Sequence, residues 1–243
     1  MRSIPRSPNL LLASLSDADF ALVSPHLTLL ELERDHLLVS SGERLTRVYF
    51  PLSGVISLVV SLASGETIEA AMIGRQSVFG SSTALDGGIS LNDATVQLSG
   101  VASVIELSDL RVAAEQSVGF RTTLIRHARI IFVQTQQAEV CVAYHTAKAR
   151  LSGWLLRMRD SSGSDTFLLT QECLARMIGV RRNAVSLVAH ALQRAGFIQY
   201  HRGRIEITNA KGLLKNACEC YGTVKAQYDR LLECGLNPEH GCD

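Results

Sequence analysis

The chain has 243 residues, of which 47% are hydrophobic and 19% charged, and its formal net charge is +1. This length suits two domains of ordinary size, and the composition excludes extended disorder. The apolar run near the amino terminus is too short for a secretory signal and no stretch approaches the roughly 18 apolar residues of a membrane span, so we expect a cytoplasmic protein without a membrane partner.

The near-neutral net charge hides an uneven distribution along the chain. Residues 1 to 110 hold six Lys or Arg against twelve Asp or Glu, whereas residues 145 to 215 hold twelve against four, an excess of eight positive charges. A local basic excess of this kind is typical of a surface that binds a polyanion. The second half of the chain is therefore the candidate for a nucleic-acid interface.

Residues 1 to 116 are predicted to form a β domain. Between about residues 36 and 108 the sequence consists of short apolar runs with alternating polarity. Turn signals separate these runs at Ser41-Gly42, Ser53-Gly54, Ser64-Gly65 and Gly87-Gly88. This pattern predicts a meander of short antiparallel strands that forms a sandwich or a small barrel.

Residues 117 to 144 are predicted to form one long helix that mediates dimerisation. Its apolar seam repeats every three or four residues and consists of Leu124, Ala128, Ile131, Thr135, Ala138 and Val142. Ile125, Phe132 and Val133 give the same helix a second apolar side, so one side is expected to pack on the β domain and the seam on a second copy. The alternative is a helix buried on both sides within a monomer, because alanine and threonine weaken the seam.

Residues 145 to 233 are predicted to form a DNA-binding domain that ends in a helix. A first helix covers about residues 146 to 159 and ends before the loop DSSGSD. The segment TQECLARMIGVRRNAVSLV then predicts two helices joined by a bend, and FIQYHRGRIEI predicts a hairpin that turns at Arg202-Gly203. Helical spacing resumes from residue 209 to residue 233.

The bend between the two helices has the pattern of a helix-turn-helix motif. Thr170 is an N-cap residue, and Glu172 is favourable in the first turn of the helix that follows. Gly179 permits the left-handed backbone that a sharp turn requires. The apolar positions that face inward on the two helices are Leu174, Ile178, Val185, Val188 and Leu192.

The outer face and the leading end of the second helix carry residue types that read DNA in the major groove. Arginine can bond guanine O6 and N7 in a bidentate manner, and asparagine can do the same with adenine N6 and N7. We therefore expect Arg182 and Asn183 to read bases, and Thr170, Gln171, Arg202 and Arg204 to contact phosphates. The full set of candidate DNA-binding residues is Thr170, Gln171, Arg181, Arg182, Asn183, Ser186, Leu187, His190, Arg202 and Arg204. The competing interpretation is a solvated basic helix on an all-α subdomain.

With these motifs the chain as a whole resembles the Crp/Fnr superfamily of bacterial transcription regulators. The resemblance covers an amino-terminal helix in LLASLSDADFALVSPHL, the β-roll segments SSGE, VYFPLSGVISL and SGETIEAAMIG, the long helix and the winged helix-turn-helix. It implies an α+β fold with an antiparallel β-roll of the cyclic-nucleotide-binding jelly-roll type. It also implies a homodimer that binds an inverted-repeat operator in double-stranded DNA, with RNA polymerase as a further candidate partner.

In this family the recognition helix presents three main side chains, which fall here on Arg182, Asn183 and either Ser186 or Leu187. The sequence departs from the family pattern twice, because an acidic residue is usual at position 183 and an arginine is frequent at position 187. We therefore expect an operator that differs from the common TGTGA and TTGAT half-sites. Leu187 is a candidate for contact with a thymine methyl group.

The effector pocket of cyclic-nucleotide-binding relatives carries F-G-E, followed about ten residues later by R-[ST]-A. In the corresponding stretch VFGSSTALDGGISLNDATV, Ser81 replaces the glutamate and Asn92-Asp93-Ala94 replaces the arginine motif. A carboxylate in place of the arginine repels a cyclic phosphate, so cyclic AMP and cyclic GMP are not expected to bind in the family's manner. Candidate residues for another anion are Gly80, Ser81, Ser82, Thr83, Asn92 and Asp93, although Gly-Ser stretches are more often plain turns.

No cofactor is expected. Iron–sulfur clusters and haem in the β-roll of relatives need cysteine or histidine ligands there. The first cysteine of this chain is Cys141, and no histidine lies between His36 and His127. An iron–sulfur cluster or haem in the β-roll is therefore disfavoured.

The carboxyl-terminal cysteines are weak candidates for a metal site. The candidate ligands are Cys218, Cys220 and Cys234, with His240 and Cys242 nearby in the tail from residue 234 to residue 243. Thiolates bind zinc or copper(I), but two cysteines two positions apart on a helix point in different directions. Reduced thiols without a metal are therefore the default expectation.

No catalytic residues are expected. The sequence contains no nucleophile elbow, P-loop, H-E-x-x-H or dinucleotide fingerprint, and its seven histidines are scattered. Two alternatives to a plain DNA-binding regulator stay open. One is a metabolite-binding module that acts through protein contacts, and the other is a thiol- or metal-responsive regulator that uses the carboxyl-terminal cysteines.

Overall fold

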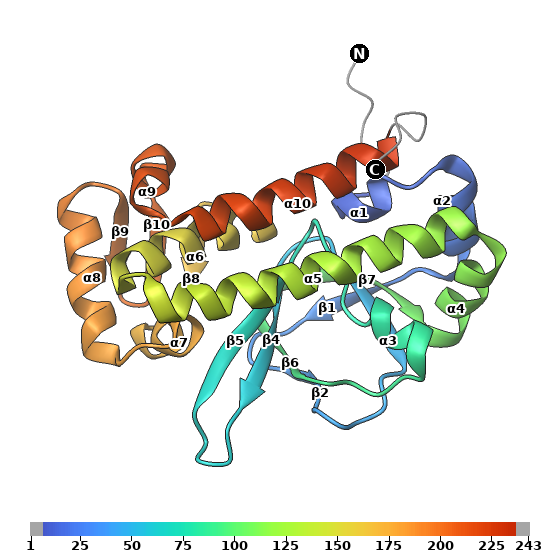
Figure 1. Cartoon of the computed structure of the whole chain (residues 1–243), viewed down its shortest axis with the longest axis horizontal. Coiled ribbons are helices and arrows are strands. Elements are labelled where there is room, and N and C mark those ends of the chain that lie inside the picture. Colours follow the sequence, from blue (N-terminus) through green and yellow to red (C-terminus); the bar gives the residue numbers. More distant parts are fainter. Residues whose placement is uncertain (1–6, 237–243) are drawn as a thin grey trace.

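The computed structural model describes residues 7–236, with side chains described for residues 7–233. Figure 1 shows two long helices, α5 (Val118–Tyr144) and α10 (Glu219–Leu236), that run side by side along the molecule. The β strands lie on one side of α5, and the helices of the carboxyl-terminal domain gather at one end. Within the described residues, no helix combines the length and the apolar character that crossing a membrane would require.

The β domain consists of two antiparallel sheets, with strand orders β1-β7-β3 and β2-β6-β4-β5. Buried apolar side chains from both sheets, among them Leu32, Ile56, Val96 and Val104, form the core between them. The strands are β1 Thr28–Leu32, β2 Leu37–Val39, β3 Arg47–Pro51, β4 Val55–Ser61, β5 Thr67–Ile73, β6 Asp93–Leu98 and β7 Gly100–Glu106. The antiparallel two-sheet arrangement predicted from alternation and glycine turns is confirmed, and so is the β-roll that the family resemblance implied. The predicted meander is wrong, because among the described strands of these two sheets β4 and β5 are the one consecutive pair that lies side by side.

Short helices close the ends of the β domain. They are α1 Leu10–Ala13, α2 Asp17–Val23, the 3-10 helix η1 Ser24–His26, α3 Ser81–Asp86 and α4 Leu107–Gln116. Asn9 caps α1 through its side-chain oxygen, while its Nδ2 donates to the carbonyl oxygens of Pro51 and Ser77, both at 2.9 Å. The buried Asn9 side chain therefore forms hydrogen bonds through both its oxygen and its nitrogen, and these bonds hold the amino-terminal segment against the sheets.

The long helix predicted over residues 117–144 is α5. Its first turn is capped by Ser117, whose Oγ accepts from the Phe120 amide at 3.0 Å. Phe120 and Leu124 of α5 and Tyr228 and Leu231 of α10 belong to one buried apolar cluster. The two helices are therefore held together by hydrophobic contact along their shared side.

This packing corrects the predicted dimer seam at Leu124. The Leu124 side chain is 0% exposed within the chain, whereas Ile125 and Phe132 are 48% and 63% exposed. The hydrophobic spacing identified both apolar sides of the helix, but Leu124 belongs to the side that the chain itself covers. The other predicted seam residues, Ala128, Ile131, Thr135, Ala138 and Val142, are partly buried or exposed.

The carboxyl-terminal domain combines four helices with a small sheet of strand order β8-β10-β9. Its elements are α6 Ala147–Ser162, β8 Thr166–Leu168, α7 Gln171–Ile178, α8 Arg182–Arg194, β9 Ile198–His201, β10 Arg204–Ile207 and α9 Ala210–Asn216. The sequence predicted the hairpin of β9 and β10 but not β8, because three residues are too few for a pattern. The predicted helix over residues 209–233 is divided into α9 and α10, with an extended backbone at Ala217.

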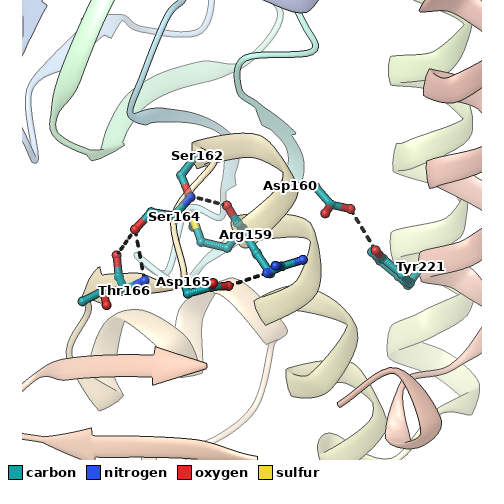
Figure 2. A network of polar contacts seen from close by, with 8 residues as sticks. Arg159, Asp160, Ser162, Ser164, Asp165, Thr166 and Tyr221 are labelled. Carbon is teal, nitrogen blue, oxygen red and sulfur yellow. Dashed lines mark hydrogen bonds and ion pairs between the residues drawn. The ribbon is translucent and has the colours of Figure 1, made fainter. Parts of the chain in front are cut away.

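Polar contacts fix the end of α6 against its neighbours (Figure 2). Arg159 pairs with Asp165 across the loop that leads into β8, and the Ser164 amide donates to the Ser162 Oγ at 3.2 Å. On the other side of α6, the Tyr221 hydroxyl donates to Asp160 Oδ2 at 2.8 Å. The last contact joins α6 to α10.

The two domains share a continuous core. Val55 and Met72 of the β domain pack in the same buried cluster as Trp154 of α6 and Leu174 of α7. Glu69 of β5 is buried and accepts a hydrogen bond from Trp154 Nε1 at 2.7 Å. The carboxyl-terminal domain is therefore docked on the β domain by apolar packing and by a buried hydrogen bond.

Candidate nucleic-acid interface

The helix-turn-helix motif is built by α7 and α8. Thr170 Oγ1 accepts from the Cys173 amide at 3.1 Å and so begins α7, and Glu172 lies in its first turn. Gly179 ends α7 with φ 59° and ψ 52°, and the Val180 amide donates to the Ala175 carbonyl at 3.0 Å. This left-handed cap with its returning hydrogen bond is the sharp turn that glycine permits.

The sharp turn also brings the motif close to the β domain. A Cβ atom added at Gly179 would lie 2.8 Å from Ile68 Cδ1 and 3.2 Å from Arg150 Nη2. Arg150 Nη2 donates to the Gly179 carbonyl oxygen at 3.2 Å. Glycine is favoured here by its backbone angles, because the two nearby atoms are the ends of flexible side chains that can shift.

The second helix, α8, buries one face and exposes the other. Val185, Ala189 and Leu192 are buried against the domain core. Leu187, on the opposite face, is 74% exposed. This exposed face is the one that a helix of this kind inserts into a groove of DNA. The other exposed candidates on α8 and at its start are Arg181, Arg182, Asn183 and His190, and Ser186 is half-buried.

One open groove brings several of the predicted residues together from three elements. Thr170 and Gln171 from the start of α7, Arg182 from the start of α8 and Arg202 from the hairpin line it together. Tyr200 also lines this groove, and its hydroxyl donates to the Leu169 carbonyl at 3.1 Å. Tyr200 is not among the residues predicted from the sequence, although its place in the same predicted hairpin as Arg202 and Arg204 was a usable signal.

The hairpin turn itself has an uncommon backbone. Arg202 has φ 46° and Gly203 has φ 79°, so both central residues of the two-residue turn have positive φ values. Such a turn suits the twist of an antiparallel hairpin. It leaves Arg202 and Arg204 exposed at the tip and on β10.

A second groove separates the start of α8 from the β4–β5 turn. Arg181 and Arg182 line it on one side, and Ser64 and Glu66 on the other. The Ser64 hydroxyl donates to the Glu66 carboxylate, and this hydrogen bond lowers the pKa of Glu66. Arg182 therefore borders both grooves, between the motif and the β domain.

The predicted effector residues lie in two segments of the β domain. Gly80 has φ 90° and precedes α3, and Ser81 is buried at the start of that short helix. Asp93 begins β6, where its carboxylate accepts from the Ser41 amide at 2.9 Å and from the Ser61 hydroxyl at 2.8 Å. The Asp93 carboxylate is thus a structural acceptor, and in the order of the motif Asn92 is the residue that stands in place of the family's arginine. Ser82, Thr83 and Asn92 are partly or fully exposed.

Four soft-ligand side chains converge elsewhere, between the end of α5 and the start of α10. Cys141, His145, Cys218 and Cys220 place their ligand atoms within 4.8 Å of one another. The sequence analysis treated Cys218 and Cys220 as divergent because it assumed one continuous helix, and it did not consider Cys141 or His145. The break at Ala217 removes that objection. The side chain of Cys234 lies outside the described residues.

The three thiols affect one another's protonation. The Cys141 thiol hydrogen-bonds to Cys218 and lowers the pKa of Cys218 to about 5. Burial raises the pKa of Cys220 to about 11.

Two family models match the chain. The Crp-like helix-turn-helix domain matches residues 149–215, and the cyclic nucleotide-binding domain matches residues 29–117. No curated protein matches the sequence. The matched ranges cover most of the carboxyl-terminal domain and most of the β domain.

Solved structures with the same overall arrangement come from several bacteria. FixK2 from Bradyrhizobium japonicum has 19% identity and a TM-score of 0.67, with 79% of this chain and 98% of that chain covered. A CRP-family transcriptional regulator from Thermus thermophilus has 22% identity and a TM-score of 0.60, with coverages of 77% and 96%. The c-di-GMP responsive regulator CLP from Xanthomonas campestris has 13% identity and a TM-score of 0.61, with coverages of 79% and 99%. Identities this low show a shared fold.

Proposed function

Since the chain is a DNA-binding transcription regulator of the Crp/Fnr type, we propose that it binds an inverted-repeat operator as a homodimer and does not respond to cyclic AMP. The observation that carries this proposal is the exposed outer face of α8, whose opposite face is buried. In this proposal residues 1–116 are a sensor-like domain, 117–144 the dimerisation helix and 145–233 the DNA-binding domain. We assign no catalytic role to any residue.

Base reading is assigned to the first turns of α8. Arg182 and Asn183 are exposed at the start of that helix and have the donor and acceptor groups for bidentate contacts with guanine and adenine. Leu187, at 74% exposed, offers an apolar surface for a thymine methyl group. Arg181, Ser186 and His190 complete the proposed reading surface.

Phosphate contacts are assigned to the groove beside α8. Thr170, Gln171 and Arg202 line this groove with Arg182, and Arg204 is exposed on the adjoining strand. Charged and hydroxyl groups at such positions orient a protein on the duplex without selecting a sequence. Their contribution to affinity decreases as salt increases, because binding releases counterions from the phosphates.

The dimer contact is assigned to the exposed apolar side of α5. Ile125 and Phe132 are seven residues apart, share one helix face and are 48% and 63% exposed. Val140 and Val142 are 43% and 41% exposed farther along α5, to either side of the line through Ile125 and Phe132. A second copy related by two-fold symmetry would cover this surface and place the two α8 helices about 34 Å apart, one turn of DNA.

Independence from cyclic AMP rests on Asn92 and Asp93. Asn92 stands where the family's motif has its arginine, so the cation that would bind a cyclic phosphate is missing, and the adjacent Asp93 carboxylate accepts bonds from Ser41 and Ser61. A negative group beside that position repels a cyclic phosphate. The ligand that the β domain recognises, if the protein needs one, is therefore expected to have other chemistry.

The test is selection of bound duplexes from a random-sequence DNA pool, followed by fluorescence anisotropy titrations at increasing salt. We expect an inverted repeat, a log affinity that falls linearly with log salt, and no effect of added cyclic AMP. Equal affinity for a scrambled duplex would contradict operator recognition. A large increase in affinity with cyclic AMP would contradict the assignment of Asp93.

The dimer assignment has its own variant and control. Phe132→Glu is expected to give a monomer by analytical ultracentrifugation and to lose affinity for the full operator. Leu214→Glu places the same charge on α9, where Leu214 is 54% exposed, and is expected to leave both properties unchanged. A dimeric Phe132→Glu protein would exclude this face of α5 as the interface.

A further inference from the structure

We propose that Cys141, His145, Cys218 and Cys220 form a zinc site that joins the end of α5 to the start of α10. This site is separate from the proposed DNA interface and does not depend on it. Thiolate and imidazole ligands of this composition, three cysteines and one histidine, bind zinc in structural sites. The four residues are far apart in sequence and are brought together only by the packing of α10 along α5.

The spacing of the ligand atoms fits tetrahedral coordination. Cys141 Sγ lies 3.4 Å from Cys218 Sγ, and Cys220 Sγ lies 3.6 Å from His145 Nδ1. Zinc bonds of about 2.3 Å to sulfur and about 2.0 Å to nitrogen place tetrahedral ligand atoms roughly 3.5 to 3.8 Å from one another. The largest separation in the cluster is within 4.8 Å, so small side-chain movements would complete the site.

His145 is oriented as a metal-binding histidine. Its Nδ1 faces the thiols, and its Nε2 lies 3.4 Å from Glu219 Oε1. Histidine ligands of metals commonly donate their second ring N–H to a carboxylate, which fixes the tautomer and the ring orientation. Glu219 is therefore a positioning residue for the proposed site.

The local backbone explains why the four side chains meet. Cys141 lies in the last turn of α5, and His145 is the residue at which that helix ends, with an extended backbone. The chain is extended again at Ala217, so Cys218 precedes α10 and Cys220 lies in its first turn. The end of α5 thus provides Cys141 and His145, and the start of α10 provides Cys218 and Cys220.

A buried cation stands close to the cluster. Arg150 is 9% exposed, and its charge interacts with Cys141 and Cys218. Three thiolates around a divalent ion leave one net negative charge, which a neighbouring guanidinium offsets. The same guanidinium donates to the Gly179 carbonyl in the turn before α8. Arg150 thus connects the proposed site with the helix-turn-helix motif.

A disulfide between Cys141 and Cys218 is the competing chemistry for these residues. The disulfide would use two of the four side chains. It would not explain why Cys220 Sγ lies 3.6 Å from His145 Nδ1. Zinc uses all four, and imidazole is a ligand for zinc but not a participant in a disulfide. The zinc assignment therefore explains more of the cluster.

The test measures metal content and does not involve DNA. Full-length protein is reduced, incubated with zinc sulfate and desalted, and its zinc is measured by mass spectrometry. We expect one zinc ion per chain, and after cobalt(II) replacement the intense visible bands of tetrahedral thiolate coordination. Cys218→Ser and His145→Asn are expected to lose most of the bound metal. Glu219→Gln is expected to weaken metal binding by about 10- to 100-fold while retaining the stoichiometry at high zinc.

Cys173→Ser is the matched control, because Cys173 is a buried thiol in α7 outside the cluster. It is expected to bind zinc like the unaltered protein. The proposal would be overturned if the unaltered protein bound less than one zinc ion per chain, or if Cys173→Ser lost as much zinc as Cys218→Ser. Recovery of a Cys141–Cys218 disulfide that resists reduction in the presence of zinc would do the same. Should a variant fail to fold, zinc stoichiometry and the cobalt spectrum of the unaltered protein still decide the question.

Discussion

Polar side chains are exposed to water on the outer face of α8 but are buried in the interior between α5, α6 and β5. Arg182 and His190 on α8 are exposed, whereas Glu69, His127 and Trp154 in the interior are buried. Water solvates the exposed groups, so their substitution alters recognition more than stability. The buried groups depend on protein partners, so their substitution alters stability. Burial, more than residue type, decides what each polar group does.

The buried groups differ from the exposed ones in their protonation as well. Burial raises the pKa of Glu69, against the effect of Arg157 and of the hydrogen bonds from Ser57 and Trp154. Burial lowers the pKa of His127 to about 4. Both shifts favour the neutral form, as expected for groups removed from water.

The largest effect is expected for Trp154→Ala, which tests the interior side of this contrast. The substitution removes a fully buried indole and the Nε1 donor of Glu69, so we expect a loss of about 3 to 5 kcal/mol in the free energy of unfolding. Urea denaturation followed by circular dichroism measures it. Trp154→Phe keeps most of the side-chain volume but removes the Nε1 donor, so it should lower the free energy of unfolding by about 1 to 3 kcal/mol. A loss below about 1 kcal/mol for Trp154→Ala would mean that the domain junction does not contribute to the cooperative fold.

The next effect is a pH dependence that arises from His127. Its Nε2 accepts from the Val78 amide at 3.3 Å and lies 2.6 Å from Ser77 Oγ, which suits the neutral ring. The folded pKa of about 4 is below the unfolded value of 6.5, so the unfolded chain binds a proton first as the pH falls. Stability is therefore lost from about pH 6.5 downward, reaching about 3 kcal/mol near pH 4.

Urea denaturation of the unaltered protein and of His127→Gln at several pH values isolates this contribution. The difference in unfolding free energy between the two proteins should shrink as the pH falls from about 7 to about 4. A difference that does not change with pH would show that His127 is protonated or solvent-accessible in the folded protein.

On the exposed side, Arg182→Ala is expected to lose about 1 to 3 kcal/mol of discrimination at one base pair of each half-site. The unfolding free energy should change by less than about 0.5 kcal/mol, because the side chain is exposed. Arg194→Ala, at the other end of the same helix, is the matched control and should preserve discrimination. Anisotropy titrations with single-base operator variants measure these effects. Equal behaviour of the two variants would remove Arg182 from the reading surface.

The smallest effect is expected for Arg204→Ala. It should weaken binding to all sequences alike and reduce the slope of log affinity against log salt by about 1. The same titrations on operator and scrambled duplexes at several salt concentrations measure it. A sequence-dependent loss would move Arg204 from phosphate contact to base reading.

The helix-turn-helix was largely predictable from the sequence. The cap at Thr170, the turn at Gly179 and the buried face of α8 follow from backbone preferences and from helical spacing over a short stretch. Such signals are local, because each depends on neighbours within one or two turns. Strand β8 escaped prediction because its pairing with β10 comes from a distant segment.

The two apolar sides of α5 could also be predicted from the sequence, but which of them the chain itself covers could not. Helical spacing treats Leu124 and Ile125 as equivalent, and only the position of α10 and the sheets buries Leu124. Ile125 and Phe132 remain exposed for that reason. Periodicity identifies a face, and the tertiary contacts decide what covers it.

An antiparallel β domain, a long helix and a helix-turn-helix could be predicted from the chain's residues, because alternation, heptad spacing and a glycine turn act over short distances. The free side of α5 and the meeting of four ligand side chains follow from tertiary packing. Cys141 and Cys218 are 77 residues apart, and their contact exists because α10 packs along α5 and starts beside its end. Contacts of that kind depend on the packing of whole elements, which no short stretch of sequence encodes.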